Sequence, residues 1–275
     1  MSKFLILVTL IFFSATSWAG TTKNLLVPID KWDSLTYPTS NSPRVYGSYS
    51  AGCLDGAQAL EAKGDGYELV RMERARFYGH PTLIEFIKDY ARQIKALGKT
   101  LYISDAAQPR GGPTAYGSEH ASHQTGLDVD IWFDSKNDQP ISLLNKDKSA
   151  IDKANWQAFN INILKLATSY NSVERIFVNP LIKQQMCQQY KGQSWMAKIR
   201  PWWGHYNHFH VRLKCPEGSP DCKAQNEVAA TDGCDSSLAW WFSQDAIDSL
   251  TKSKRAGPIL PVLPQQCLAV LNWKR

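Results

Sequence analysis

The stretch that decides the fold is Tyr206 to Leu213, YNHFHVRL, in which apolar and polar side chains alternate. Alternation with a period of two is typical of a β-strand with one buried face. The apolar side chains expected on that face are those of Phe209, Val211 and Leu213. His208 and His210 then share the opposite face, with β-carbons about 7 Å apart. Both imidazoles can therefore address one small object, such as a metal ion.

A second stretch, Leu127 to Phe133 (LDVDIWF), alternates in the same way and predicts another strand. One face of this strand carries Asp128 and Asp130, and His123 lies just before it. The alternation places both carboxylates on one side of the strand and does not choose between them.

Five of the six histidines lie in two short clusters, which are formed by His120 and His123 and by His205, His208 and His210. Two histidines and one carboxylate from separate elements match the ligand set of catalytic zinc, whose fourth position stays open for water. Ordinary polar histidines are one alternative, and the clustering of five beside two carboxylates argues against it. A structural zinc site is a second alternative, but such sites are closed by four ligands and often include Cys.

The segments around these strands alternate between helical and extended patterns. Helices are predicted at Pro81–Leu97, Asn155–Tyr170 and Pro180–Tyr190, and further strands at Thr100–Ser104 and Arg175–Val178. Loops and short strands are expected in residues 20–65, and loops in the Gly-rich segment 105–119 and between Cys215 and Cys234. An extended arm that contains Pro258, Pro261 and Pro264 and is pinned by Cys267 is expected near the C-terminus. This order predicts an α+β fold, with a small antiparallel sheet, surrounding helices and disulfide-pinned loops.

The N-terminus has the features of a signal peptide. Lys3 precedes the apolar run Phe4–Phe13, and Ser17-Trp18-Ala19 offers small residues for cleavage after Ala19. A membrane anchor is the alternative, but the run is shorter than the roughly 20 residues that span a bilayer. We expect residues 20–275 to form one exported domain, with no membrane span after the signal is removed. The net charge of +6 is a mild bias, and no basic run with interleaved aromatics indicates nucleic acid.

The six cysteines are Cys53, Cys187, Cys215, Cys222, Cys234 and Cys267. An even number in an exported chain predicts three disulfides, and no C-x-x-C pair suggests a metal site. Six cysteines allow fifteen pairings, of which only Cys215 with Cys222 is indicated by a short, turn-rich loop.

The motifs together resemble a known family, the penicillin-insensitive murein endopeptidases, which is grouped with lysostaphin, D-Ala-D-Ala metallopeptidases and the hedgehog N-terminal domain. The segments that carry the resemblance are His120–Asp130 (HASHQTGLDVD), Arg175–Pro180, Lys183–Gln185, Arg200–Trp202, His205–Leu213, Tyr78–Pro81 and Ser50–Cys53. The match extends over nearly the whole chain after the signal peptide. Joined to the flanking blocks, the H-x₆-D and H-x-H spacings are highly specific.

The resemblance implies a periplasmic, penicillin-insensitive zinc endopeptidase that cuts the D-Ala–meso-diaminopimelate cross-links of peptidoglycan. One Zn²⁺ per chain is implied, with His123, Asp130 and His210 as its ligands, which selects Asp130 over Asp128. His208 is implied as catalytic base or electrostatic helper, and His205 as a residue for transition-state stabilisation or substrate contact.

The resemblance has further implications and one departure. A second metal in such proteins would use His120, an acid such as Asp147, and a histidine where this chain has Ala150. We therefore expect one metal, with His120 shaping the pocket. The implied disulfides are Cys53–Cys267, Cys187–Cys234 and Cys215–Cys222.

Residues near the histidine clusters are candidates for substrate binding, and they are Trp202, Trp203, Tyr206, Arg110 and Tyr116. Two other functions compete with the endopeptidase. One is a D,D- or L,D-carboxypeptidase on the same scaffold, and the other is a non-catalytic, zinc-containing protein that binds the cell wall.

Overall fold

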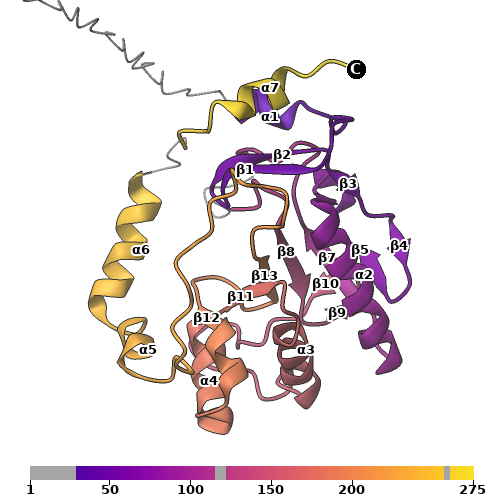
Figure 1. The fold of residues 1–275 in the computed structure, drawn as a ribbon. Helices are drawn as coiled ribbons and strands as arrows, with labels where there is room; N and C mark the ends of the chain where they lie inside the picture. The colour runs from indigo at the N-terminus through magenta and orange to yellow at the C-terminus, as the bar shows by residue number, and fades with distance from the viewer. Residues whose placement is uncertain (1–28, 115–121, 257–260) are drawn as a thin grey trace, which may run out of the picture.

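The computed structural model describes residues 29–114, 122–256 and 261–275 (Figure 1). The expected signal peptide, His120 and Tyr116 lie outside these ranges. In chain order the elements are α1 (Ile29–Asp33), β1 (Arg44–Ser48), β2 (Ala51–Asp55), β3 (Gln58–Ala59), β4 (Lys63–Gly64), β5 (Tyr67–Leu69), the 3-10 helix η1 (Met72–Arg74), β6 (Tyr78–Gly79), α2 (Pro81–Ala96), β7 (Leu101–Asp105), β8 (Asp128–Trp132), β9 (Ser135–Lys136), β10 (Gln139–Pro140), α3 (Ala158–Thr168), β11 (Val173–Val178), α4 (Pro180–Tyr190), the 3-10 helix η2 (Ser194–Lys198), β12 (Ile199–Pro201), β13 (His208–Leu213), α5 (Ser236–Trp240), α6 (Gln244–Ala256) and α7 (Gln266–Asn272).

The largest sheet of the described residues has seven strands in the order β12-β11-β13-β8-β7-β5-β4. Its four middle strands pair antiparallel. Two pairings nearer the edges, β11 with β12 and β5 with β7, are parallel. The predicted α+β class is therefore confirmed, and the sheet is mixed where we predicted only antiparallel pairing.

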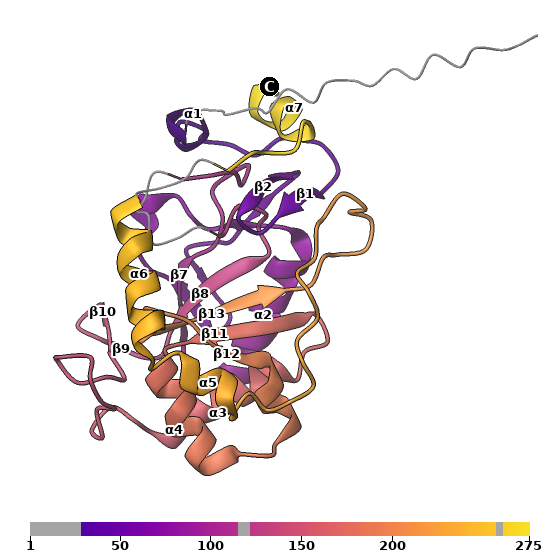
Figure 2. The same ribbon diagram turned by 90° about the vertical axis from the view of Figure 1, so that its left-hand side faces the viewer.

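Helix α2 packs against the sheet, and α6 lies on the other side of the strands (Figure 1). Figure 1 shows α2 on the right of the central strands and α6 on the left, and in Figure 2 α2 lies behind the strands. The main hydrophobic core contains the apolar face of α2, including Leu83 and Ile87, together with Ile131, Phe209 and Val211 of the central strands. The alternation in β8 and β13 thus buries one face against the helices and leaves the polar face for the site.

The helix boundaries follow from local capping. The Nδ1 of His80 accepts a hydrogen bond from the backbone N–H of Thr82, and Pro81 occupies the first turn of α2. Asn179 caps α4 in the same way, with Oδ1 accepting from Leu181 N at 2.9 Å. The predicted helix Pro180–Tyr190 is confirmed at both ends.

The second predicted helix begins later than the sequence pattern suggested. α3 starts at Ala158, whereas the apolar periodicity predicted a start near Asn155. Asp152 explains the delay, because its carboxylate accepts hydrogen bonds from Ala154 N and Asn155 Nδ2 and so forms a turn. The helix begins only after Gln157 N donates to Asn160 Oδ1 at 2.8 Å.

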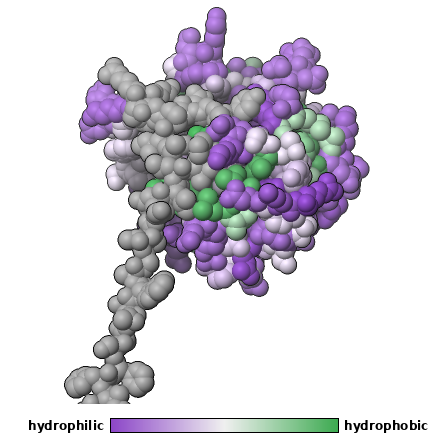
Figure 3. Space-filling view, turned by 90° about the horizontal axis from the view of Figure 1, so that it is seen from above, coloured by the Kyte–Doolittle hydropathy of each residue, from purple (hydrophilic) through white to green (hydrophobic). Residues whose placement is uncertain are grey.

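The C-terminal segment packs on the β1–β2 hairpin through a second, smaller core. Its buried residues are Trp32, Cys53, Leu263, Cys267, Val270 and Leu271. The predicted extended arm has neither helix nor strand at residues 261–264, and it leads into α7, which was not predicted; α5 and α6 were not predicted either. Figure 3 views this end of the molecule from above, where hydrophobic residues are exposed among hydrophilic ones.

Three disulfides join Cys53 to Cys267, Cys187 to Cys234 and Cys215 to Cys222. They are the pairs that the family resemblance implies. In the described part of the chain, no helix is long and apolar enough to cross a membrane.

Candidate metal centre

The pairing of β8 with β13 assembles the centre. The two strands run antiparallel with His210 opposite Asp130, so the two side chains meet on the polar face of the sheet. His210 Nδ1 lies 3.0 Å from Asp130 Oδ1. His123 enters from the preceding loop, and its Nε2 lies 3.4 Å from Asp130 Oδ2. The structure therefore brings together the three residues predicted as metal ligands.

These three side chains fit a metal ion. They are 1–3% exposed, and their ligand atoms lie within 4.8 Å of one another. Two imidazoles and one carboxylate are the donor types of three-ligand zinc centres. His123 has a backbone φ of 67°, a left-handed conformation that is uncommon for residues other than glycine. Such backbone conformations cluster at functional sites because the surrounding structure holds them in place.

Asp128, the carboxylate that the family resemblance does not select, holds the predicted ligands in position. Its Oδ1 accepts hydrogen bonds from His210 Nε2 at 2.9 Å and from Arg212 Nε at 2.7 Å. Its Oδ2 accepts from the backbone N–H of His123 at 3.1 Å and from Arg212 at 3.2 Å. Because Asp128 occupies Nε2 of His210, Nδ1 is the nitrogen that faces Asp130. A carboxylate behind a ligating histidine is a recurrent arrangement in metal sites.

The charges of the centre stabilise its carboxylates in the ionised form. Burial alone would raise the pKa of Asp128, but Arg212 and His210 outweigh burial and hold it well below its usual value. Burial opposes ionisation of Asp130 too, and His123 and His208 outweigh it. Burial would lower the pKa of His210, whereas Asp128 and Asp130 raise it to about 9. The ionised carboxylates of Asp128 and Asp130 therefore balance the positive charges of Arg212 and His210 in the buried centre.

Two further histidines lie beside the predicted ligands. His208 Nε2 lies 3.8 Å from Asp130 Oδ2, and the ring centroids of His205 and His208 are 4.9 Å apart. Burial lowers the pKa of His208 and lowers that of His205 to about 3. Both imidazoles are therefore neutral at neutral pH, and each can accept a proton.

Hydrogen bonds decide which nitrogen of each neutral ring carries the proton. Nδ1 of His208 lies 2.7 Å from Asn207 Oδ1, and Nδ1 of His205 lies 2.7 Å from the carbonyl oxygen of Trp203. Both oxygens only accept, so Nδ1 carries the proton in both rings and Nε2 has the free lone pair. The expected help of His205 to an oxyanion is not supported by this tautomer, because Nε2 is an acceptor.

The loop before β13 fixes the position of His205. Gly204 and His205 both have positive φ, 71° and 49°. Asn179 Nδ2 donates to the carbonyl of Gly204 at 2.8 Å, and its backbone N–H donates to the carbonyl of His205 at 3.0 Å. The residue that caps α4 thus also holds a histidine of the site, which explains why the Arg175–Pro180 block accompanies the histidine motif.

The other predicted site residues differ in their placement. Trp203 and Tyr206 are half-buried in the same loop as His205. Asp147 is exposed, and in the part of the chain that the structure describes it joins no group of metal-ligating side chains. Its expected partner His120 lies outside the described residues.

Arg110 does not lie at the site, which corrects its prediction as a substrate contact. Its guanidinium is buried and donates to the carbonyl oxygens of Tyr37, Val270, Leu271 and Trp273. Arg110 therefore anchors the C-terminal helix α7. Arg110 was predicted as a functional residue because it lies in a Gly-rich loop. The sequence contains no signal for its contact with the distant C-terminal helix.

Fold and centre together define a class of protein: an α+β domain with a buried His–Asp–His group whose donor types suit a metal ion, beside two neutral histidines. Residues 45–272 match the family described as Penicillin-insensitive murein endopeptidase, and the chain belongs to this family.

Curated relatives carry the same description. The chain is 39% identical to a penicillin-insensitive murein endopeptidase of Haemophilus influenzae, over 98% of this chain and 96% of the relative. It is 38% identical to the protein of that name from Yersinia enterocolitica, over 88% of this chain and 90% of the relative. The corresponding protein of Salmonella paratyphi B is 35% identical, over 99% of this chain and 98% of the relative.

Proposed function

We propose that this chain is a periplasmic, zinc-dependent endopeptidase that hydrolyses D-Ala–meso-diaminopimelate cross-links of murein. The observation that carries the proposal is the buried group His123, Asp130 and His210 with the neutral His208 beside it. The names of the relatives support murein as the substrate. Residues 1–19 would be removed on export, and residues 20–275 would function as a single domain.

The three ligands favour zinc, because imidazole nitrogen suits zinc and one hard carboxylate is tolerated in its catalytic sites. Zinc in such a site supplies Lewis-acid chemistry by acidifying water and polarising a carbonyl oxygen. Asp128 would keep His210 in the tautomer that ligates through Nδ1, since it accepts the proton of Nε2.

The residues around the ligands supply the proton transfers. Among the residues that the structure describes, Nε2 of His208 has no hydrogen-bond partner, and it accepts the proton of the attacking water. The same nitrogen can then return the proton to the amine that leaves when the peptide bond breaks. His205, with its free Nε2, would accept an N–H of the substrate backbone.

This chemistry explains insensitivity to penicillin. β-Lactams acylate a nucleophilic side chain, and hydrolysis here needs no such nucleophile. The six cysteines all lie in disulfides. A drug that acts by acylation therefore has no target among the residues that carry out the proposed reaction.

Digestion of purified muropeptides tests the proposal. Cross-linked dimers and pentapeptide monomers are incubated separately with the zinc-loaded protein, with and without penicillin, and the products are identified by mass spectrometry. We expect dimers to be converted to monomers at the same rate in both conditions, and monomers to remain intact. Release of terminal D-Ala from monomers would instead indicate a carboxypeptidase. An absence of any product from zinc-loaded, disulfide-intact protein would contradict an enzymatic role.

A further inference from the structure

An aromatic cluster lies next to the candidate metal centre and has no role in the proposed chemistry. It consists of Trp202 and Trp203, from the loop after β12, and Trp240 and Trp241, from the end of α5. We call these four residues the tryptophan cluster. Trp241 is its hub, with ring centroids 5.7 Å from Trp202, 5.6 Å from Trp203 and 5.3 Å from Trp240. The interplanar angles of 59–84° exclude face-to-face stacking of these rings.

The cluster is unusually exposed for its composition. Trp202 is 52% exposed and Trp240 46% exposed, and the neighbouring Phe242 and Ile247 are exposed as well. Indole rings bury large apolar areas when they find a partner, so soluble proteins rarely leave several of them together in water. An exposed group of this kind indicates a binding surface.

The cluster is continuous with the metal centre. The ring centroid of Phe177 lies 5.8 Å from Trp202 on one side and 5.3 Å from His210 on the other. The carbonyl of Trp203 fixes the tautomer of His205. A molecule bound across the cluster therefore lies next to whatever is bound at the centre.

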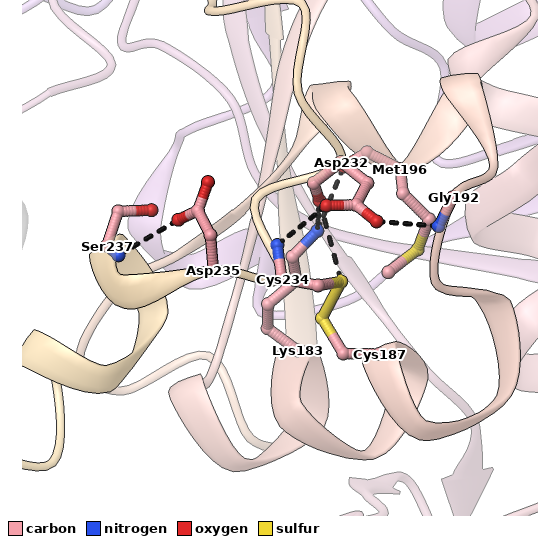
Figure 4. The surroundings of a disulfide bond; sticks show 8 residues. All are labelled: Lys183, Cys187, Gly192, Met196, Asp232, Cys234, Asp235 and Ser237. Atoms are coloured by element: carbon pink, nitrogen blue, oxygen red, sulfur yellow. Dashed lines mark hydrogen bonds between the residues drawn. A yellow bond between two sulfur atoms is a disulfide. The ribbon is translucent and has the colours of Figure 1, made fainter.

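The segment that carries Trp240 and Trp241 is held rigidly to α4. Figure 4 shows the surroundings of its disulfide, Cys187–Cys234. Lys183 is fully buried, and its Nζ donates to the carbonyl of Asp232 at 2.5 Å and to that of Met196 at 2.9 Å. The carboxylate of Asp232 in turn accepts from the backbone N–H of Cys234 at 2.9 Å.

The first turn of α5 is fixed in addition by its cap. Asp235 Oδ1 accepts from Ser237 N at 2.9 Å, as Figure 4 shows. A surface whose backbone is fixed before binding loses little conformational entropy when a ligand arrives. The exposed indoles are thus presented on a preorganised support.

The chemistry around the cluster selects the ligand. Residues 235–256 carry three acids, Asp235, Asp245 and Asp248, and three bases, Lys252, Lys254 and Arg255, so the net charge of the segment favours neither an anionic surface nor a cationic ligand. Sugar rings are uncharged, present flat C–H faces that pack on indole rings, and carry hydroxyls that accept from indole N–H groups. Murein cross-links are attached to strands of such rings. We propose that the tryptophan cluster binds the glycan strand that carries the peptide to be cleaved.

This inference rests on the proposed function, but its test does not require catalysis. The protein is titrated calorimetrically with chitohexaose, a peptide-free chain of six β-1,4-linked N-acetylglucosamine units. We expect wild type to bind, and Trp240→Ala and Trp202→Ala each to weaken binding at least about tenfold. Trp240→Phe, which keeps an aromatic ring, should lose less. Leu97→Ala, an exposed apolar residue at the end of α2, is the matched control and should bind like wild type.

Two results would overturn the inference. One is an absence of chitohexaose binding by folded wild type, and the other is equal binding by wild type and both alanine variants. Binding of neutral or anionic phospholipid vesicles in place of chitohexaose would assign the cluster to a membrane surface and reject the glycan. If muropeptide dimers are still cleaved when any of these results is found, the proposed function is retained and only the glycan-binding site is rejected.

Discussion

Replacing Asp128 by Asn removes a charge from the residue that connects His123 and His210, the two histidines proposed as ligands, to Arg212. The side chain keeps its shape but loses one of its two acceptor oxygens and its negative charge. In the wild-type protein the Asp128 carboxylate accepts four hydrogen bonds: one from His210, one from the backbone N–H of His123 and two from Arg212. The amide group of Asn can serve at most part of this set, and its N–H₂ would face the donors of His123 or Arg212.

The size of the effect follows from burial. Asp128 is 0% and Arg212 5% exposed, so the variant leaves a buried guanidinium without its counter-charge. Removing one partner of a buried ion pair costs about 3–5 kcal/mol, a large fraction of the 5–15 kcal/mol that stabilises a typical domain. Loss of the partner behind a ligating histidine typically weakens metal binding by about 10–100-fold.

Two measurements check this prediction. Urea unfolding of the metal-free proteins gives the change in the free energy of unfolding, and competition with a chromophoric chelator gives the change in zinc affinity. Asp245→Asn, on the exposed face of α6, is the matched control and should change neither quantity. Zinc affinity within twofold of wild type for a folded Asp128→Asn variant would refute the reasoning that Asp128 positions the ligands.

Three further predictions follow from the site and its surroundings. His208→Gln should lower kcat on muropeptide dimers by about 10²–10⁴-fold while zinc affinity stays unchanged, and an unchanged kcat would reject His208 as the proton acceptor. Burial lowers the pKa of Lys183 from 10.5 to about 7, so between these pH values the unfolded chain binds a proton that the folded chain does not. Stability against urea should therefore increase with pH in this window by up to about 1.4 kcal/mol per pH unit, and Lys183→Met should remove that increase; equal slopes for both proteins would contradict it. The double substitution Cys187→Ser with Cys234→Ser opens a loop with a sequence separation of 47 and should cost about 4 kcal/mol in urea unfolding, whereas a cost below about 1 kcal/mol would show that Lys183 and Asp232 suffice to hold the segment.

The elements that the sequence predicts well are those with strong local signals. The alternation in Leu127–Phe133 and Tyr206–Leu213 predicts two strands, and their pairing puts His210 opposite Asp130. The helix Pro180–Tyr190 is marked by a proline at its first position and a capping Asn179. Such signals lie within a few neighbouring residues of the sequence, so they can be recognised without knowing the fold.

What the sequence does not predict depends on contacts between distant segments. Asp128 and Asp130 are equivalent in the alternation, and only the approach of His123 and Arg212 makes one a positioning residue and the other a candidate ligand. Arg110 was predicted in a binding loop because glycines surround it, but its partners are carbonyls about 160 residues further along the chain. The Gly-rich pattern describes the backbone and contains no information about such a partner.

The helix α5 was missed for a related reason. α5 has only five residues, too few for an apolar period to be recognised. Its position depends on the Cys187–Cys234 disulfide, on Lys183 and on the cap by Asp235. The tryptophan cluster therefore becomes visible only when this segment is folded against the loop that carries Trp202.

The central claim is that His123, Asp130 and His210 bind one zinc ion that the cleavage of murein cross-links requires. The most direct measurement is the rate of dimer cleavage by chelator-treated protein as zinc is added back from zero to two equivalents. The account predicts a rise that ends at one equivalent for wild type, and no activity at any zinc concentration for folded His210→Ala. Full activity of the metal-free protein, or restored activity of His210→Ala to the level of wild type, would contradict it.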